Sequence, residues 1–273
     1  MDRRLWPATA RAAHTSLQGR ISGVVFTDGQ ETEIAAPLAN LRSSPDGARE
    51  RQLLHGDAFC IIDTAGSHAF GFARKDGYCG WIAQADLQPA RVKTHWLAAP
   101  SHLYPAPRVQ AQPLMPLPFG ARVQVLGQSG NFANTDQGYV PLPHLRALGD
   151  WADDPVAVAE TFLHCPYLWG GNSHAGLDCS GLVQAALLAC GSAAGADSDL
   201  QQVLGEELAA QATLARGDLL FWRGHVAMAV DSTRLIHANG HAMSVAYEDI
   251  SPCISRIADA GGGGVIHRRR IAR

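Results

Sequence analysis

The stretch GLDCSGLVQ, residues 176–184, decides how the C-terminal part of this chain is expected to fold. A glycine-rich loop precedes it, and residues 180–190 are compatible with a helix whose apolar side chains fall on one face. Asp178 stands just before the first turn, where a carboxylate oxygen can accept hydrogen bonds from free backbone N–H groups. Cys179 is therefore expected at the N-terminal end of a helix that follows a glycine loop.

A cysteine in that position is suited to act as a nucleophile. The thiolate is the reactive form, and the free N–H groups and positive dipole of a helix N-terminus favour it. The same N–H groups can hold the oxyanion that forms when a carbonyl carbon is attacked. The remaining cysteines lack this setting and are expected to be small buried apolar residues: Cys60, Cys79, Cys165, Cys190 and Cys253.

Two histidines downstream can serve as the base that a thiol nucleophile needs. Residues 225–230 and 234–238 have the composition of strands, and a polar turn at 231–233 joins them. Because side chains alternate along a strand, His225 and His237 can be presented by adjacent strands in line with the helix that carries the thiol. His225 would then take the thiol proton, while His237 binds its other ring nitrogen and fixes its orientation.

Five short motifs occur in one order in this part of the chain. They are YLWGG (167–171), DCSGLVQ (178–184), GDLLFW (217–222), HVAMAV (225–230) and LIHA (235–238). In this order they resemble the NlpC-type family of peptidoglycan cysteine peptidases, a circularly permuted relative of the papain fold, over residues 154–271. The resemblance implies that Cys179 is the nucleophile, His225 the general base and His237 the orienting residue. It also places Tyr167 beside the oxyanion site.

The upstream part of the chain favours short strands. Between residues 36 and 87, turn signals recur at intervals of about 8 to 12 residues, and Asp76-Gly77 is a hairpin signal. A looser copy of the same order of turns and strands follows about 60 residues later, with GYV at 138–140 where the first copy has GYCGW at 77–81. The first copy resembles the bacterial SH3-type domain, and the second copy is more degenerate.

The expected fold class is therefore multi-domain, with two small all-β SH3-like barrels followed by an α+β, papain-like catalytic domain in circularly permuted order. The expected boundaries are an N-terminal arm at 1–35, a first barrel at 36–90, a second, degenerate barrel at 91–149 and the peptidase domain at 150–273. Asp154 and Pro155 indicate where the last domain starts, because they suit a helix cap and a first helical position.

Two SH3-type barrels ahead of such a peptidase domain resemble the family's cytoplasmic recycling members. This resemblance implies cleavage of γ-D-glutamyl-diamino acid bonds in murein peptides with a free N-terminal L-alanine. Asp197 and Ser198 match the subgroup's amine-binding pair, a role that suits a carboxylate. Ala196 departs from the pattern, which commonly has Arg there. The other substrate-binding residues expected are Asp178, Ser180, Trp169, Tyr78 of the first barrel and, as its acidic partner, Glu50.

Composition limits the expected partners. Charged residues make up 17% of the chain and the formal net charge is −3, which argues against the basic stripe of a nucleic-acid-binding protein. We expect no export signal, no membrane span and a cytoplasmic location, because no sufficiently long apolar run occurs. No metal or other cofactor is expected, since the spacing of Cys179 and His225 is not that of a zinc site. The expected partner is the small murein peptide, and the oligomeric state stays open.

Two other functions fit the same residues. A related thiol enzyme could carry out another acyl transfer, as an N-acetylmuramoyl amidase or a transferase does. The chain could also be a non-catalytic module that binds cell-wall peptides. The arginines at 268–270 are expected to be a solvated chain end rather than a nucleic-acid patch, given the net charge.

Overall fold

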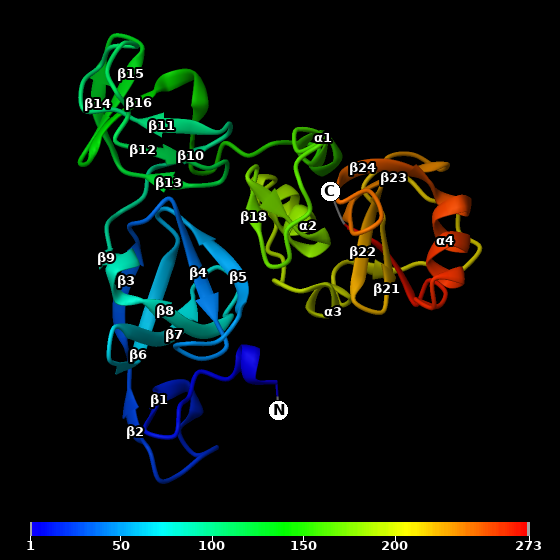
Figure 1. Ribbon diagram of the computed structural model, residues 1–273, viewed down its shortest axis with the longest axis horizontal. Helices are drawn as coiled ribbons and strands as arrows, with labels where there is room; N and C mark the ends of the chain where they lie inside the picture. Colours follow the sequence, from blue (N-terminus) through cyan, green and yellow to red (C-terminus); the bar gives the residue numbers. More distant parts are fainter. Residues whose placement is uncertain (1, 272–273) are drawn as a thin grey trace. The chain divides into compact units, whose positions relative to one another are not determined.

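A computed structural model describes residues 2–271 of the chain (Figure 1). The chain divides into two compact units, Met1–Asp150 and Trp151–Arg273. Within the part that the structure describes, no helix has both the length and the apolar character needed to cross a membrane.

A seven-stranded antiparallel sheet dominates the first unit. Its order is β5-β4-β8-β7-β6-β3-β9, with β3 (Gln30–Ile34), β4 (Leu38–Arg42), β5 (Arg49–Leu54), β6 (Ala58–Ala65), β7 (His68–Ala73), β8 (Cys79–Ala83) and β9 (Leu87–Pro89). The connection from β7 to β8 contains Gly77 at φ 74°, so the expected Asp76-Gly77 turn is confirmed. The sheet begins at Gln30, earlier than the expected boundary at residue 36, because β3 pairs with β6 and β9.

Shorter elements flank this sheet. Ahead of it lie η1 (Arg3–Leu5), β1 (Ala12–His14), η2 (Thr15–Leu17) and β2 (Val25–Thr27), with β1 and β2 paired in parallel. Between its strands β8 and β9 lies η3 (Gln84–Asp86). After the sheet come β10 (His95–Leu97), β11 (Ser101–Leu103), β12 (Met115–Leu117), β13 (Arg122–Val123), β14 (Val125–Ser129), β15 (Phe132–Thr135), β16 (Gly138–Pro141), η4 (Leu142–His144) and β17 (Leu145–Ala147).

Strands β10 to β17 form three small sheets, ordered β13-β10-β17, β11-β12 and β14-β15-β16. In this part β16, η4 and β17 follow one another, as β8, η3 and β9 do at the end of the large sheet. This recurrence of strand, 3-10 helix and strand agrees with the tandem repeat in the sequence. The count of two separate barrels remains a prediction.

A six-stranded antiparallel sheet forms the centre of the second unit, in the order β20-β25-β21-β22-β23-β24. Its strands are β20 (Glu206–Glu207), β21 (Leu219–Trp222), β22 (His225–Ala229), β23 (Arg234–Asn239), β24 (Ser244–Asp249) and β25 (His267–Arg270). The other elements are α1 (Pro155–Glu160), the hairpin β18 (Asn172–Ser173) and β19 (Gly176–Leu177), α2 (Cys179–Ala189), α3 (Ser198–Gln201) and α4 (Ile250–Asp259). The expected hairpin from β22 to β23 is confirmed.

Helices cover both faces of this sheet. Figure 1 shows α1 and α2 on one side of β22 and β23, and α4 on the other side. Alternate residues of β21, β22 and β23 pack against α4 in an apolar cluster that includes Leu220, Trp222, Ala227, Leu235 and Cys253. Two expected helix starts are confirmed, since Asp154 caps α1 with Pro155 in its first turn and Asp178 caps α2.

The expectation of a solvated arginine end is wrong. Residues 267–270 form β25, which pairs with both β20 and β21. Arg269 forms an ion pair with Glu207, and Arg270 donates hydrogen bonds of 2.9 and 2.7 Å to the buried carboxylate of Asp218. The run is part of the sheet through its backbone pairing, and its acidic partners come from segments that are distant in the sequence.

Candidate active site

Cys179 is the first residue of α2, as expected, and Asp178 determines the loop around it. One carboxylate oxygen of Asp178 accepts hydrogen bonds from the Gly181 N–H (2.7 Å) and the Ser180 hydroxyl (3.0 Å). The other oxygen accepts from the Gly170 N–H at 2.9 Å. Asp178 and Ser180 thus hold the glycine loop to the helix start, which gives both residues a positioning contribution next to the nucleophile.

Two glycines allow this loop to approach the helix closely. A Cβ on Gly181 would lie 2.6 Å from the Gly171 carbonyl oxygen, and one on Gly171 would lie 2.4 Å from the Gly176 carbonyl oxygen. Both contacts are with backbone, which cannot move aside as a flexible side chain would. The glycines of the two motifs are therefore required by packing around Cys179.

The structure brings the two predicted histidines together. Nε2 of His225 and Nδ1 of His237 lie 2.8 Å apart and share a hydrogen bond. His225 is the first residue of β22, and the β22–β23 ladder extends only to the pair Met228–Ile236, so near this histidine β22 is paired with β21 but not with β23. The N–H of Val226, in this part of β22, donates a hydrogen bond to the sulfur of Cys179.

A carboxylate behind the second histidine was missed by the sequence analysis. Nε2 of His237 lies 3.1 Å from Oε2 of Glu248 on β24, and Arg256 of α4 donates hydrogen bonds of 2.8 and 2.6 Å to the two oxygens of Glu248. In the register of β23 and β24, Glu248 is opposite Leu235, which shares a strand face with His237. Strand alternation could have suggested this face, but the register was not available from the sequence.

Burial changes the expected chemistry of the thiol. Cys179 is only 6% exposed, and burial raises the pKa of its thiol to about 12, with a further contribution from the charge of Asp178. Backbone N–H groups, including that of Val226, lower this pKa without outweighing burial. The N–H groups at the helix start therefore lower the thiol pKa, as expected, but burial outweighs them in the resting site. Burial also lowers the pKa of His225 to about 3, so the resting pair is a neutral thiol and a neutral imidazole.

Tyr167 lies in the same electrostatic environment as the nucleophile. Burial raises the pKa of its hydroxyl to about 12, and the charges of Cys179 and Asp178 raise it further. The hydroxyl therefore keeps its proton near neutral pH. It can therefore act as a hydrogen-bond donor, and its place beside an oxyanion site stays a prediction.

Asp197 and Ser198 lie at the start of α3, and two buried glutamines attach this segment to α2. Gln201 donates hydrogen bonds to the carbonyl oxygens of Ser180 (2.9 Å) and Gly195 (3.0 Å). Gln184 of α2 donates to the Ala194 carbonyl at 3.0 Å. The segment that carries Asp197 is thereby held against the first turns of α2, the helix that begins with Cys179.

The remaining predicted residues have different surroundings. Trp169 is 67% exposed, so it is available to a ligand and is not a core residue. In the first unit, Tyr78 is buried beneath the guanidinium of Arg51, 5.2 Å from its ring centre, and Glu50 forms an ion pair with Arg3. The roles of Tyr78 and Glu50 in binding an amine stay predictions from the resemblance.

One group of side chains has the donor atoms of a metal site. His237, Glu248 and Cys253 offer atoms within 4.8 Å of one another. Arg256 binds both carboxylate oxygens and also lies 3.7 Å from the Cys253 sulfur. A cation would have to displace this guanidinium, so the residues present do not favour a metal.

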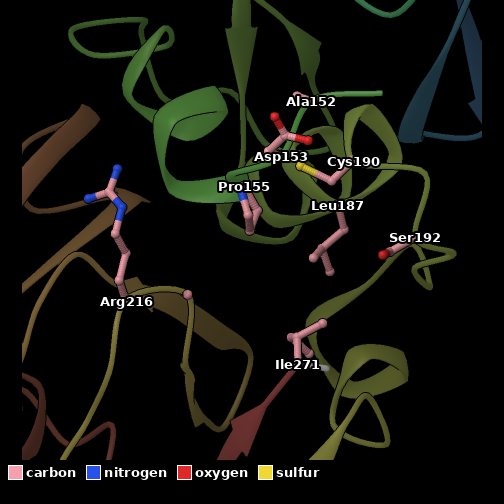
Figure 2. A pocket seen from close by; sticks show the side chains of 9 residues that line it. Ala152, Asp153, Pro155, Leu187, Cys190, Ser192, Arg216 and Ile271 are labelled. Carbon is pink, nitrogen blue, oxygen red and sulfur yellow. The ribbon is translucent and has the colours of Figure 1, made fainter. Parts of the chain in front are cut away.

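Two cavities lie in the second unit. One, of about 240 Å³, is at the far end of α2 and is lined by residues that include Asp153, Leu187, Cys190 and Arg216 (Figure 2). Arg216 is paired with Asp154 and Glu160, so its charge is already neutralised. The other, of about 180 Å³, lies at the start of β22, and its lining includes His225. This second cavity is therefore the one of the two that adjoins the histidine pair.

Two parts of the chain match known families. Residues 164–257 match the NlpC/P60 family, and residues 41–87 match the bacterial dipeptidyl-peptidase SH3 domain. A crystal structure of an NlpC/P60 family protein from Bacillus cereus ATCC 10987 is similar, with a TM-score of 0.74 and 20% identity over 89% of this chain and 100% of that chain. At this identity the likeness shows the fold.

Two curated proteins match shorter stretches. Dipeptidyl-peptidase 6 of Lysinibacillus sphaericus is 34% identical over 87 residues, which are 32% of this chain and 32% of that protein. Gamma-D-glutamyl-L-lysine dipeptidyl-peptidase of Bacillus cereus (strain ATCC 10987 / NRS 248) is 31% identical over 130 residues, 45% of this chain and 36% of that protein. The chain thus spans about a third of the length of each relative.

Proposed function

We propose that this chain, whose residues 164–257 match the NlpC/P60 family, is a cysteine peptidase that hydrolyses the γ-D-glutamyl-diamino acid bond of murein peptides with a free N-terminal L-alanine. The proposal rests on two linked contacts. The N–H of Val226 in β22 donates a hydrogen bond to the sulfur of Cys179 at the start of α2, and the adjacent His225 is hydrogen-bonded to His237. The names of the two curated relatives support the choice of bond.

In the proposed reaction, the proton of the Cys179 thiol moves to a ring nitrogen of His225 as sulfur attacks the γ-carbonyl carbon of D-glutamate. Backbone N–H groups at the start of α2 hold the oxyanion, with the Tyr167 hydroxyl as a further donor. His225 then gives this proton to the departing amine of the diamino acid, leaving a thioester on sulfur. Water attacks the thioester, and His225 passes the water's proton back to sulfur.

The protonation states bear on the order of these steps. Because the thiol of Cys179 has a pKa raised to about 12 and the imidazole of His225 one lowered to about 3, a charged pair is not the favoured resting form. Proton transfer therefore accompanies the attack on the carbonyl carbon, when the oxyanion charge develops.

Recognition of a free amine is proposed for Asp197. Its carboxylate can pair with the ammonium group of the N-terminal L-alanine, and the adjacent Ser198 supplies a hydroxyl. The attachment of α3 to α2 through Gln201 supports this role, because it keeps the carboxylate on the same rigid support as Cys179.

The test uses the full chain with L-Ala-γ-D-Glu-diaminopimelate, its L-lysine counterpart and N-acetylated copies of both, with products identified by mass. The proposal expects release of L-Ala-D-Glu from the free-amine peptides and none with Cys179→Ala. Release of an intact peptide from N-acetylmuramoyl peptide would instead assign an amidase. Binding without turnover, or undiminished cleavage by Cys179→Ala, would overturn the proposed mechanism.

A further inference from the structure

The histidine pair of the site is continued by a charged pair on its far side. His237, whose side chain is fully buried, lies between His225 (2.8 Å at Nδ1) and Glu248 (3.1 Å at Nε2). Arg256 reaches both carboxylate oxygens of Glu248 from α4, at 2.8 and 2.6 Å. Three strands and a helix thus supply one continuous line of hydrogen bonds.

This line determines which nitrogen atoms carry hydrogen. An ionised carboxylate only accepts hydrogen bonds, so Nε2 of His237 must donate to Glu248. In a neutral imidazole the other nitrogen is then an acceptor, so Nδ1 of His237 must accept from Nε2 of His225. Nδ1 of His225 is left with its lone pair and is the only ring nitrogen of the pair that can take a proton.

We propose that Glu248, held by Arg256, is a positioning residue that sets the tautomers of both histidines and so leaves Nδ1 of His225 as the base. The proposal rests on the proposed function for the proton's source, the thiol of Cys179. Glu248 acts through His237 and touches neither the nucleophile nor the substrate in this scheme. A hydrogen-bond donor at position 248 would allow the opposite tautomer of His237.

The charged surroundings keep Glu248 in the form that the proposal needs. Hydrogen bonds from Arg256 are the main cause that lowers the pKa of the Glu248 carboxyl to about 2, and Cys253 and His237 lower it further. Burial lowers the pKa of His237 to about 4; the facing Glu248 opposes this, and Arg256 and His241 lower the pKa further. The carboxylate is therefore ionised throughout the neutral pH range.

The same groups limit the charge that His225 carries at rest. Burial is the main cause of its lowered pKa, His237 and Arg256 lower it further, and Glu248 opposes them. When His225 takes the proton, the carboxylate two hydrogen bonds away stabilises the resulting imidazolium. Arg256 keeps Glu248 in place, and its charge adds to the effect of burial in lowering the pKa of His225.

The direct test is nitrogen-15 NMR of the imidazole rings in the full chain near pH 7. The proposal expects both His225 and His237 to be protonated at Nε2 in the wild type. In Glu248→Gln, whose amide can donate or accept, we expect His237 to lose this single tautomer, and Glu248→Asp should restore it. Asp249→Asn is the matched control, because this exposed neighbour makes no side-chain cap bond to α4.

Peptide turnover supplies a second readout. In Glu248→Gln we expect kcat to fall about tenfold to a hundredfold with KM changed less than about twofold, a smaller loss than the roughly 10⁴-fold of a carboxylate that contacts the base directly. Asp249→Asn should leave both constants within about twofold. A merely structural role would instead lower the melting temperature without altering the tautomers.

The outcomes separate this inference from the proposed function. An Nδ1-protonated His237 in the wild type, or unchanged tautomers in Glu248→Gln, would overturn the role of Glu248 even if murein peptides are cleaved. The expected tautomers in an enzyme that cleaves no murein peptide would support the role of Glu248 and overturn the proposed substrate.

Discussion

The side-chain amide of Gln201 donates a hydrogen bond of 2.9 Å to the carbonyl oxygen of Ser180. Gln201 is fully buried, and it also donates to the Gly195 carbonyl at 3.0 Å. One side chain therefore connects three places: the loop before α3, the short helix α3 itself and the first turn of α2 beside Cys179. This attachment predicts that changes at Gln201 affect the site without touching the nucleophile.

Replacing Gln201 with Leu should detach α3 from α2. The two carbonyl oxygens that it binds would lose their partner, which costs about 1–3 kcal/mol of unfolding free energy when such groups are buried. We expect KM for the free-amine peptide to rise more than kcat falls. Gln202→Leu is the control, because that neighbouring side chain makes no hydrogen bond among the described residues. Equal effects of the two variants on KM would contradict the prediction.

Neutralising Asp197 tests the amine-binding role. Asp197→Asn should raise KM for peptides with a free L-alanine by about tenfold or more, since a charge-assisted pair to ammonium is lost. The small residual activity on an N-acetylated peptide should not change. The measurement is steady-state kinetics on both peptides, with Asp199→Asn on the exposed side of the same short helix as the control. A loss shared equally by both peptides would count against an amine site.

Adding one methyl group to Gly181 should disturb the loop around the nucleophile. The new Cβ would meet the Gly171 carbonyl oxygen at 2.6 Å and the Asn172 side-chain oxygen at 2.7 Å. Gly181→Ala should therefore cost about 1–3 kcal/mol in unfolding free energy and strongly lower kcat. Gly264→Ala, where a Cβ meets nothing within 4 Å, should change stability by less than about 0.5 kcal/mol. Calorimetry of both variants checks this.

Alkylation of Cys179 should reveal its raised pKa. Because burial raises the pKa of the thiol to about 12, the thiolate fraction should increase about tenfold per pH unit from pH 7 to pH 10 without reaching a plateau. The measurement is the rate of iodoacetamide modification at Cys179, followed by peptide mass mapping. A pH-independent rate above pH 6 would indicate a preformed thiolate–imidazolium pair and contradict the neutral resting state.

Features that depend on neighbours along the chain were correctly predicted. Asp178 caps the helix because its carboxylate reaches N–H groups only two or three residues away. His225 and His237 meet because each lies at a position fixed by strand alternation on both sides of a short turn. The arginines of β25 were misjudged because Glu207 and Asp218, which neutralise them, lie in other segments.

Local sequence is thus enough to place Cys179 at the start of its helix, to bring the two histidines together and to match residues 164–257 to the NlpC/P60 family. Packing specifies their protonation states, since the burial of Cys179 and His225 removes the water that would stabilise a charged pair. The line from His237 through Glu248 to Arg256 also comes from packing, because it needs the register of β24 on β23 and the docking of α4 on that sheet. No spacing along the chain encodes these contacts, as each joins segments that meet only when the sheet and its helices are assembled.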